Sequence, residues 1–575
     1  MTTHTTTLAK PPESGSARAK SDWARRFGMP SAWSAFTIAL GFAILTPIVI
    51  FFARAFADGG SAFDRMLDQP NIGHILWTTV YLAVGSTTLG AVGAVGLAAV
   101  VTRVPARLQA TAAVLPLLPL VIPPVALIYG WIFLFAPDVG YGNALLRMLP
   151  LFSQMDEGPI NIYSVGGIIF VTATDVVGII FIFVYARLRE INGSVEAAAR
   201  ISGASATRTF FTVTLPLLRP ALVAGLVTSL LVQLGQFTAP LFLGRRDNIE
   251  VVTTVIFRLR EQYPIDYALT AAMGFPLLIV GVVAIAAQRR VVGDQRRYVT
   301  QGTGRGMFKK PSKAAGAAII IYGSIVVVLP IVAITLVAFS PFWNGDLGGI
   351  TFTTDNIRTA FQGTAIIDSV INTLSASALA AIIVLPLGFI AALAMSGIVR
   401  APALVQRALD YIFIAPLAVP RALLGMSVLF VFIRPPFSLY GTLTMFVIGY
   451  VFIALPFALR SQYSSMIGVH STVFEAARVC GASQFTMVRT IALPVAVRGM
   501  AAALAMTFVL LSNDFAVSVM VQTPGRQVMG TLLFQFEQSG AISQVAVMAL
   551  VMTLITAIVL SITVRLGGRS TLENL

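Results

Sequence analysis

Two similar segments decide how this sequence is interpreted: VEAAARISGASATRTFFTVTLPLLRP at residues 195–220 and FEAARVCGASQFTMVRTIALPVAVRG at residues 474–499. When they are aligned at an offset of 278 residues, which places Gly203 on Gly481, the Gly-Ala-Ser and Leu-Pro strings coincide. Each segment begins with Glu and Ala, which favour a helix, and a glycine then interrupts it. A second helical stretch follows and stops at Leu-Pro, just before a long apolar run. The sequence therefore predicts the same short helix–turn–helix twice.

The chain around these segments is too apolar for a soluble protein. Of its 575 residues, 57% are hydrophobic and 11% are charged, and the mean hydropathy is +0.85. A soluble domain carries about 25% charged residues, so much of the surface here must face lipid. The net charge of +15 comes from Lys and Arg in short loops without interleaved aromatic residues, which argues against a nucleic-acid-binding protein.

Twelve apolar runs are long enough to cross a bilayer, which takes about 20 helical residues. Continuous runs of this length indicate helices, because a helix satisfies its own backbone hydrogen bonds in lipid. The polar lead before the first run is too long for a signal peptide, so this run is expected to be a retained span. The expected spans are residues 33–53, 75–101, 111–136, 161–186, 218–243, 267–287, 314–340, 369–397, 408–433, 439–459, 496–521 and 542–564.

The expected fold is an all-α integral membrane protein made of two parallel six-helix repeats. Because each half has an even number of spans, both copies enter the membrane in the same direction, unlike an inverted repeat. Trp77-Thr78 and Asn372-Thr373, at an offset of 295 residues, are taken as a second correspondence between the halves. The expected boundaries are an N-terminal tail (1–32), a first half (33–290), a linker (291–313), a second half (314–566) and a C-terminal tail (567–575).

The positions of the basic residues set the expected orientation. Most of the 39 Lys and Arg residues fall in the tails, in the linker and in the loops after the second and fourth spans of each half. The positive-inside rule therefore places both termini, the linker and both helix–turn–helix segments in the cytoplasm. One outer loop runs against this rule, because it carries four arginines: Arg245, Arg246, Arg258 and Arg260.

The two segments resemble the EAA motif of the permeases of binding-protein-dependent ABC importers. That motif has Glu-Ala-Ala, three further residues, a glycine and a later Leu-Pro, and the string from Glu475 to Gly481 fits it. The first copy departs by one residue, because Glu196 lies seven residues before Gly203 and Ala197 takes the place of the glutamate. The alternative is a pair of interfacial amphipathic helices that only stabilise their loops. The resemblance implies ATPase-coupling residues in both copies: Glu196, Ala197, Ala198, Gly203, Ala204, Ser205, Pro216, Glu475, Ala476, Ala477, Gly481, Ala482, Ser483 and Pro494.

The fused layout of twelve spans looks like the iron(III)-type and thiamine-type importer permeases. The runs Asn161–Ser164 and Arg297–Thr300 look more like the iron(III)-type branch. This resemblance implies the type I importer fold in a bacterial inner membrane, two copies of a separate ABC ATPase on the coupling segments, and a periplasmic or lipid-anchored solute-binding protein. ATP would bind to the partner subunits, and no cofactor is expected in this chain. None of its lysines follows a glycine, which excludes a P-loop, and the chain is not expected to be an enzyme.

Polar side chains inside the expected spans are candidates for lining a solute pathway, because a charge at mid-bilayer costs about 2.5–3.5 kcal/mol. At the repeat offset Gln236 corresponds to Asp514, so the two fifth spans would face each other across a pseudo-two-fold axis. An Asp514–Arg421 or an Asp175–Arg421 pair would be a gate or a buried brace. The alternative for each residue is a structural hydrogen bond between helices. The candidates are Gln233, Gln236, Asn513, Asp514, Asp175 and Arg421.

No metal site is expected. The three histidines, His4, His74 and His470, are far apart in sequence and none forms an H-E-x-x-H motif. His74 and His470 fall on opposite sides of the membrane, so they cannot share an ion. The single cysteine, Cys480, excludes a disulfide framework and a thiolate cluster.

The expected function is the transmembrane subunit of an ABC importer for a small solute, with iron(III) as the leading cargo. The same resemblance admits thiamine, a phosphonate or a sugar phosphate. An ion-coupled secondary transporter is the alternative class, but it would carry acidic or basic relays in several spans, and intramembrane charges here are few. A membrane scaffold or sensor explains neither the duplicated segments nor the paired polar positions.

Overall fold

The structure is a computed structural model that describes residues 32–191, 193–292, 311–348, 351–396, 398, 403–467 and 471–567. The predicted tails, most of the linker, His4, His470 and the run Arg297–Thr300 lie outside the described residues. The described residues form helices and connecting loops without a strand, so the predicted all-α fold is confirmed.

Nine helices in the described part of the chain are long and apolar enough to cross a membrane. Eight of them overlap a predicted span and are named here: α2 (Ala32–Ala53), α4 (Ile72–Val101), α9 (Val165–Glu190), α12 (Leu215–Leu234), α15 (Tyr267–Val292), α19 (Ala365–Met395), α22 (Leu443–Ile467) and α28 (Ile542–Gly567). The ninth joins α16 (Lys313–Gly323) to α17 (Leu329–Ala338). A further helix, α25 (Leu493–Ser512), takes the place of the eleventh predicted span.

The third span of each half, predicted at 111–136 and 408–433 with prolines inside it, is sharply bent at those prolines. In the first half, the helices α5 (Ala106–Val114) and α6 (Leu118–Val121) meet α7 (Pro124–Phe135) at an angle of 92°. In the second half, α20 (Ala403–Ala418) meets α21 (Arg421–Phe432) at 103°. Pro123-Pro124 and Pro420 start the second helix of each pair, because proline disfavours a helical conformation at the residue before it and donates no backbone hydrogen bond.

The fifth spans also differ from the prediction, since neither continues to its predicted outer end. The helix α12 ends at Leu234, and a short helix, α13 (Thr238–Leu243), follows after a break. Likewise α25 ends at Ser512, before α26 (Ala516–Val521). Two more short helices, α14 (Val252–Glu261) and α27 (Met529–Gln538), complete this region. Apolar composition continues across both breaks, and for this reason hydropathy alone does not reveal them.

The first span of each half packs against the other half. The helix α2 lies along α20 and α21, while α16 and α17 lie along α4 and α7. Phe51 of α2 meets Phe430 of α21 edge to face, with ring centroids 6.0 Å apart. At Gly130 of α7, a Cβ atom would lie 2.5 Å from Pro330 of α17, so this crossing requires a glycine. The two halves therefore exchange their first helices.

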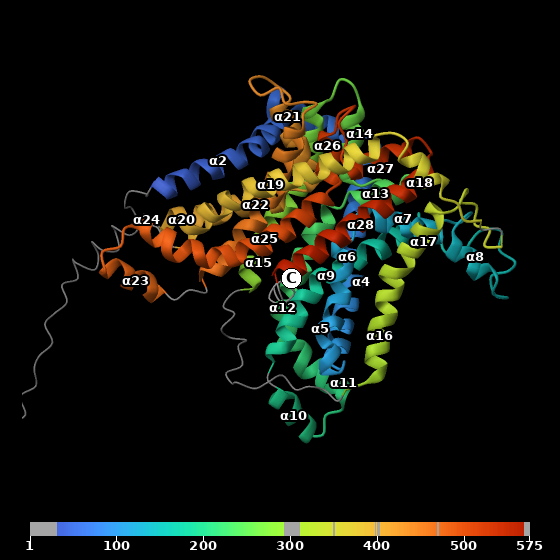
Figure 1. The fold of residues 1–575 in the computed structure, drawn as a ribbon, viewed down its shortest axis with the longest axis horizontal. Helices are drawn as coiled ribbons and strands as arrows, with labels where there is room; N and C mark the ends of the chain where they lie inside the picture. Colours follow the sequence, from blue (N-terminus) through green and yellow to red (C-terminus); the bar gives the residue numbers. More distant parts are fainter. Residues whose placement is uncertain are drawn as a thin grey trace, which may run out of the picture.

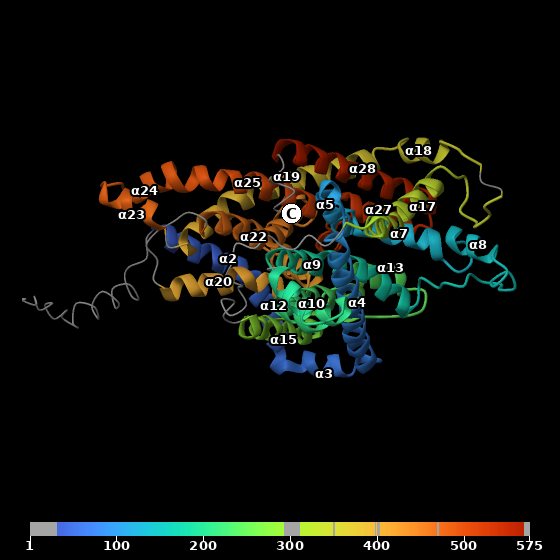
Figure 2. The ribbon, with the colours of Figure 1, turned by 90° about the horizontal axis from the view of Figure 1, so that it is seen from below.

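The transmembrane helices converge at one end of the molecule and diverge toward the other (Figures 1 and 2). The short helices α13, α14, α26 and α27 cluster at the converging end in Figure 1. The two predicted helix–turn–helix segments, α10–α11 (Gly193–Ile201 and Ala206–Thr209) and α23–α24 (Ser471–Val479 and Gln484–Met487), lie at the diverging end and apart from each other.

Equivalent hydrogen bonds fix the register of the repeat in the second spans. The Thr79 hydroxyl accepts from the Val252 amide at 3.0 Å, and the Thr373 hydroxyl accepts from the Met529 amide at 2.8 Å. Each bond satisfies the first free N–H of a short helix at the converging end. Thr79, and not Thr78, is thus the counterpart of Thr373, and the predicted correspondence at this place was wrong by one residue because two threonines are adjacent.

Candidate functional site

The two coupling segments, α10–α11 and α23–α24, have the same backbone hydrogen bonds and the same turn conformation. In the first, the amides of Gly203 and Ala204 donate to the carbonyls of Arg200 and Ala199, both at 3.0 Å. In the second, the amides of Gly481 and Ala482 make the equivalent bonds, also at 3.0 Å. Both glycines have a left-handed backbone, with φ of 84° and 79°, which a side chain disfavours. The predicted turn is thus present twice.

Ser205 and Ser483 begin the second helix of each segment. Their hydroxyls accept from the amides three residues later, Arg208 at 3.2 Å and Thr486 at 3.1 Å. A serine in this position satisfies an N–H group that has no partner within the helix. These two residues of the motif therefore fix the direction in which the chain leaves the turn.

The predicted stop at each Leu-Pro is wrong, because the helix continues through it. A π-turn at Phe210–Thr214 precedes Pro216, and another at Val488–Ala492 precedes Pro494. A proline has no N–H to donate and its ring clashes with the carbonyl four residues earlier, and the wider π-turn removes this clash. Helix α11 therefore runs into α12 as one rod, Ala206–Leu234, and α24 leads into α25 in the same way.

Each coupling segment exposes an apolar residue at the end of its first helix. Ile201 is 87% exposed and its counterpart Val479 is 89% exposed. Phe211 and Phe485 are also exposed, on the second helix or its continuation. The two segments thus offer exposed apolar side chains on short helices that are continuous with long ones.

The glutamates of the two copies differ in position and in environment. Glu196 is 6% exposed, and its carboxylate accepts a hydrogen bond from Thr214 at 2.6 Å. Glu475 is exposed, and so are Ala198 and Ala476, whereas Ala197 and Ala477 are partly buried. The residue at the place of Glu196 in the second copy is Phe474, which is buried. Glu196 is therefore not the structural counterpart of Glu475.

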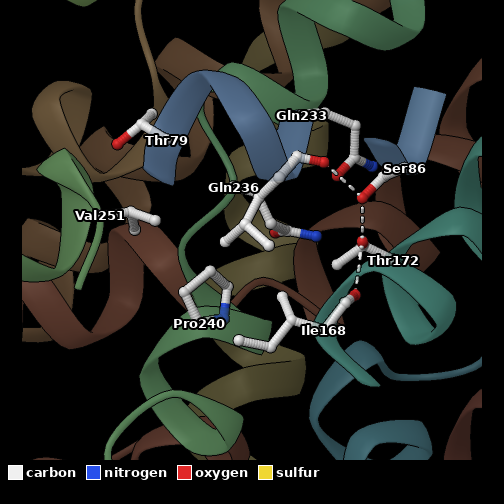
Figure 3. A pocket seen from close by; sticks show the side chains of 9 residues that line it. Thr79, Ser86, Ile168, Thr172, Gln233, Gln236, Pro240 and Val251 are labelled. Carbon is white, nitrogen blue, oxygen red and sulfur yellow. Dashed lines mark hydrogen bonds between the residues drawn. The ribbon is translucent and has the colours of Figure 1, made fainter. Parts of the chain in front are cut away.

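Gln233 and Gln236, two predicted pathway residues, line a small cavity between α4, α9 and α12 (Figure 3). The cavity has a volume of about 10 Å³, the space of one water molecule. The hydroxyls of Ser86 and Thr172 lie 2.6 Å apart on its wall, and the Gln233 Nε2 has no hydrogen-bond partner among the described residues. In the second half, Tyr450 replaces Thr172 and bonds Ser518 at 2.9 Å. The polar side chains at this position therefore differ between the two halves.

Asn513 and Asp514 lie at the break between α25 and α26, where both are buried. The Asn513 Nδ2 donates to the Val121 carbonyl at 3.0 Å, which is at the bend in the third span of the other half. The Asp514 Oδ2 accepts from the amides of Val517 and Ser518, both at 3.1 Å, at the start of α26. In this structure both side chains form structural hydrogen bonds at the break. This is the alternative to a role in lining a solute pathway.

Arg421 pairs with Asp514 and lies at the start of α21. Its Nη1 is 3.8 Å from the Asp514 Oδ1, and the side chains are 45% and 1% exposed. Arg421 also interacts electrostatically with Asp175 of the other half, without an ion pair between them among the described residues. Of the two predicted pairs, Asp514–Arg421 is thus the one in contact.

Five phenylalanines close the converging end of the molecule. They are Phe237, Phe242 and Phe257 of the first half and Phe515 and Phe534 of the second half, and all are at least 92% buried. Phe242 lies 5.3 Å from Phe515 and 5.8 Å from Phe534, centroid to centroid. No local pattern in the sequence predicts this cluster, although Phe237 and Phe515 occupy equivalent positions of the repeat.

The four outer arginines that oppose the positive-inside rule are all paired. Arg246 contacts Asp138 at 2.9 Å and Arg258 contacts Glu250 at 2.8 Å, while Arg260 pairs with Glu261 and also donates to the Met520 and Gln522 carbonyls of the other half. Arg245 lies 3.8 Å from Glu537 across the halves. Burial raises the pKa of Glu537, and Arg245 opposes this shift. Arg245 and Arg260 thus join the two halves, whereas Arg246 and Arg258 form their ion pairs within the first half.

The described residues contain no group of three or more His, Cys, Asp or Glu side chains that could hold a metal ion. His74 is exposed at the start of α4.

Comparison with known proteins agrees with these features. A relative from Sinorhizobium fredii, a probable ABC transporter permease protein, is 24% identical over 92% of this chain and 94% of its own length. A ferric transport system permease protein of Actinobacillus pleuropneumoniae is 25% identical over 81% of this chain and 68% of its own length. A putative 2-aminoethylphosphonate transport system permease protein of Salmonella paratyphi A is 25% identical over 45% of this chain and 96% of its own length.

Among solved structures, a bacterial ABC transporter involved in the import of the acidic polysaccharide alginate aligns with a TM-score of 0.37 and 17% identity, over 44% of this chain and 93% of that one. The family of binding-protein-dependent transport system inner membrane components matches this chain twice, over residues 90–297 and 384–570. Each match includes one coupling segment, and together they span more than half of the chain. The chain belongs to this family, the permeases of ABC importers.

Proposed function

We propose that this permease binds two copies of an ABC ATPase, one on α10–α11 and one on α23–α24, and that ATP-driven closure of the ATPases moves α12 and α25. The observation that carries this proposal is the same rigid unit in both halves: a glycine turn, a serine cap and a π-turn that runs into a transmembrane helix. An interfacial helix that only stabilised its loop would not need to be continuous with a span.

The outer end is proposed to receive a solute-binding protein, either periplasmic or lipid-anchored. In the present state the phenylalanine cluster closes this end, while the helices diverge at the end that carries the coupling segments (Figure 1). We assign the diverging end, both termini and the linker to the cytoplasm of a bacterium, with permease halves at 33–290 and 314–566. The support is the excess of basic residues in the inner segments.

Iron(III) is the proposed cargo, supported by the similarity to a ferric transport system permease over 81% of this chain. A phosphonate is the second candidate, because the putative 2-aminoethylphosphonate permease of Salmonella paratyphi A is also 25% identical, over 45% of the chain. In this proposal the binding protein selects the solute. A test is the melting temperature of that binding protein with ferric iron, with 2-aminoethylphosphonate and with thiamine. A shift with the phosphonate or thiamine alone would overturn the assignment of iron.

The role of the coupling segments is tested by Glu475→Lys and Gly481→Asp in the full complex. We expect both to abolish uptake and to reduce co-purification of the ATPase, while the permease remains in the membrane. Asp355→Lys, which makes the same charge change at an exposed acid of the outer region, is the matched control. Wild-type uptake and ATPase recovery in the Glu475 and Gly481 variants would contradict the proposal.

A further inference from the structure

We infer that the two coupling segments engage the ATPase unequally: the second presents a carboxylate to it, whereas the first uses its carboxylate as an internal brace. This inference rests on the proposed function, since it concerns how the two proposed ATPase copies are held. It goes beyond the motif, which contains a glutamate in both copies.

The carboxylate of the first segment points away from any partner surface. Glu196 is 6% exposed and Thr214, its hydrogen-bond donor at 2.6 Å, is 1% exposed. Thr214 is the last residue of the π-turn that leads into α12. The bond therefore ties the coupling helix α10 directly to the start of the fifth span, and a protein docked on the outside cannot reach it.

The second segment lacks both members of this brace. At the repeat offset, Glu196 is replaced by Phe474 and Thr214 by Ala492, and both replacements are buried. An apolar contact thus occupies the place of the hydrogen bond. The exposed Glu475 stands one residue further along the helix, where the first segment has the partly buried Ala197.

A different bond holds the second coupling helix. The Arg478 guanidinium donates to the Ile398 carbonyl at 3.0 Å, just beyond the inner end of α19. The first coupling helix is thus fastened to the fifth span of its half, and the second to the region after the second span. Movement of an ATPase would thus reach the fifth span on both sides through the continuous helices and, on the second side, also the region after the second span.

The electrostatic consequence is a difference in docking strength. A hydrogen bond or ion pair to a charged group is worth about 1.5–3 kcal/mol, which corresponds to about 10–100-fold in affinity. If the ATPase copies are identical, the same basic or amide-rich groove would contact the carboxylate of Glu475 on α23 but the methyl group of Ala197 on α10. On the first side, docking depends on the apolar residues around Ile201.

The test uses the full complex in detergent or nanodiscs, with native mass spectrometry to count ATPase copies per permease as the complex is diluted. For the wild type we expect two copies. Glu475→Ala should weaken one copy by about tenfold or more and leave a complex with a single ATPase, while Ala197→Glu should strengthen the other. Combining both substitutions should still leave a single copy, now held more tightly on the first segment than in Glu475→Ala alone. Loss of both copies together, or no loss, in Glu475→Ala would overturn the inference.

The brace is tested separately by Glu196→Ala and Thr214→Val, with Glu196→Gln as the conservative variant. We expect the first two to lower uptake alike while both ATPase copies stay bound, and Glu196→Gln to retain more uptake because an amide oxygen also accepts from Thr214. If Glu196→Ala loses an ATPase copy and Thr214→Val does not, Glu196 contacts the ATPase and the inference fails. A wild-type permease that binds no ATPase would instead refute the proposed function.

Discussion

Phe237 and Phe515 are equivalent residues of the two halves, and their rings stack across the pseudo-two-fold axis with centroids 5.8 Å apart and planes inclined by 16°. Each follows directly on the break of a fifth span. The helices α12 and α25 begin at the coupling segments, and the phenylalanine cluster lies at their other ends. The helices that the ATPases would move are therefore the ones that carry this closure. Separation of these helices would pull this stack apart.

Truncation of the stack should loosen the closure. We expect Phe515→Ala to raise ATP hydrolysis severalfold in proteoliposomes without binding protein, because the open state no longer has to break these ring contacts. Aromatic pairs contribute about 0.5–1.5 kcal/mol beyond their buried area. Phe515→Leu, which keeps most of the volume, should have a smaller effect, and the exposed Phe352→Ala none. Unchanged basal hydrolysis in Phe515→Ala would argue against a closure at this place.

Asn513 joins a break in one half to a bend in the other, so its removal should cost stability. In Asn513→Leu, the Val121 carbonyl and the Thr556 hydroxyl both lose a partner. A buried polar group without a partner costs about 1–3 kcal/mol, and we expect a lower thermal midpoint in detergent. Thr553→Val is the control, since that hydroxyl bonds only the preceding turn of its own helix. Equal midpoints for the two variants would contradict a joint at Asn513.

The Arg421–Asp514 pair should behave as a coupled unit. Arg421→Ala leaves the Asp514 carboxylate buried without its cation, which is costly, whereas Asp514→Asn removes the charge and keeps an oxygen for the α26 amides. We therefore expect the double variant to have a higher thermal midpoint than Arg421→Ala alone. Strictly additive effects of the two substitutions would indicate that the charges do not interact. Asp514→Ala should be less stable than Asp514→Asn, because it also removes the cap.

Gly203 and Gly481 should be required for their left-handed backbone conformation and not because a Cβ atom would clash with a neighbour. No atom lies within 4 Å of a Cβ built on Gly203 or Gly481, but a left-handed backbone costs an alanine about 1–2 kcal/mol. We expect Gly481→Ala to reduce ATPase co-purification and Gly481→Asn to reduce it less, since asparagine tolerates this conformation. Gly316→Ala is matched for open space but lies in the helix α16, and it should be neutral. Equal losses for alanine and asparagine would contradict this explanation.

The sequence was sufficient for the class of fold and for the turns, because both depend on local signals. Long apolar runs force helices in lipid, and the glycines at 203 and 481 mark the same turn in both copies. The one-residue shift between Glu196 and Glu475 was visible in the alignment. The sequence did not reveal that this shift buries Glu196, because the buried carboxylate is bonded to Thr214, which lies 18 residues away.

The breaks in the spans could not be predicted from composition. The bend before Pro124 and the break after Leu234 lie within apolar runs, so a hydropathy profile passes over them. Pro123-Pro124 do mark the bend in the sequence, but the break at Asn513 is held by a contact between the halves, in which its amide donates to the Val121 carbonyl. In the same way, nothing in the sequence around Phe237 and Phe515 distinguishes them from other apolar residues of the spans, because their stacking depends on the tertiary fold.

The exchange of the first helices bears on how this permease can be assembled. Because α2 lies on α20 and α21 and α16–α17 lie on α4 and α7, a lone half would leave those apolar surfaces bare. Packing of these helices across the halves should therefore hold a chain cut within the connecting stretch together as one particle. The covalent join would then matter mainly during biosynthesis, where it guarantees that unlike halves meet in equal number.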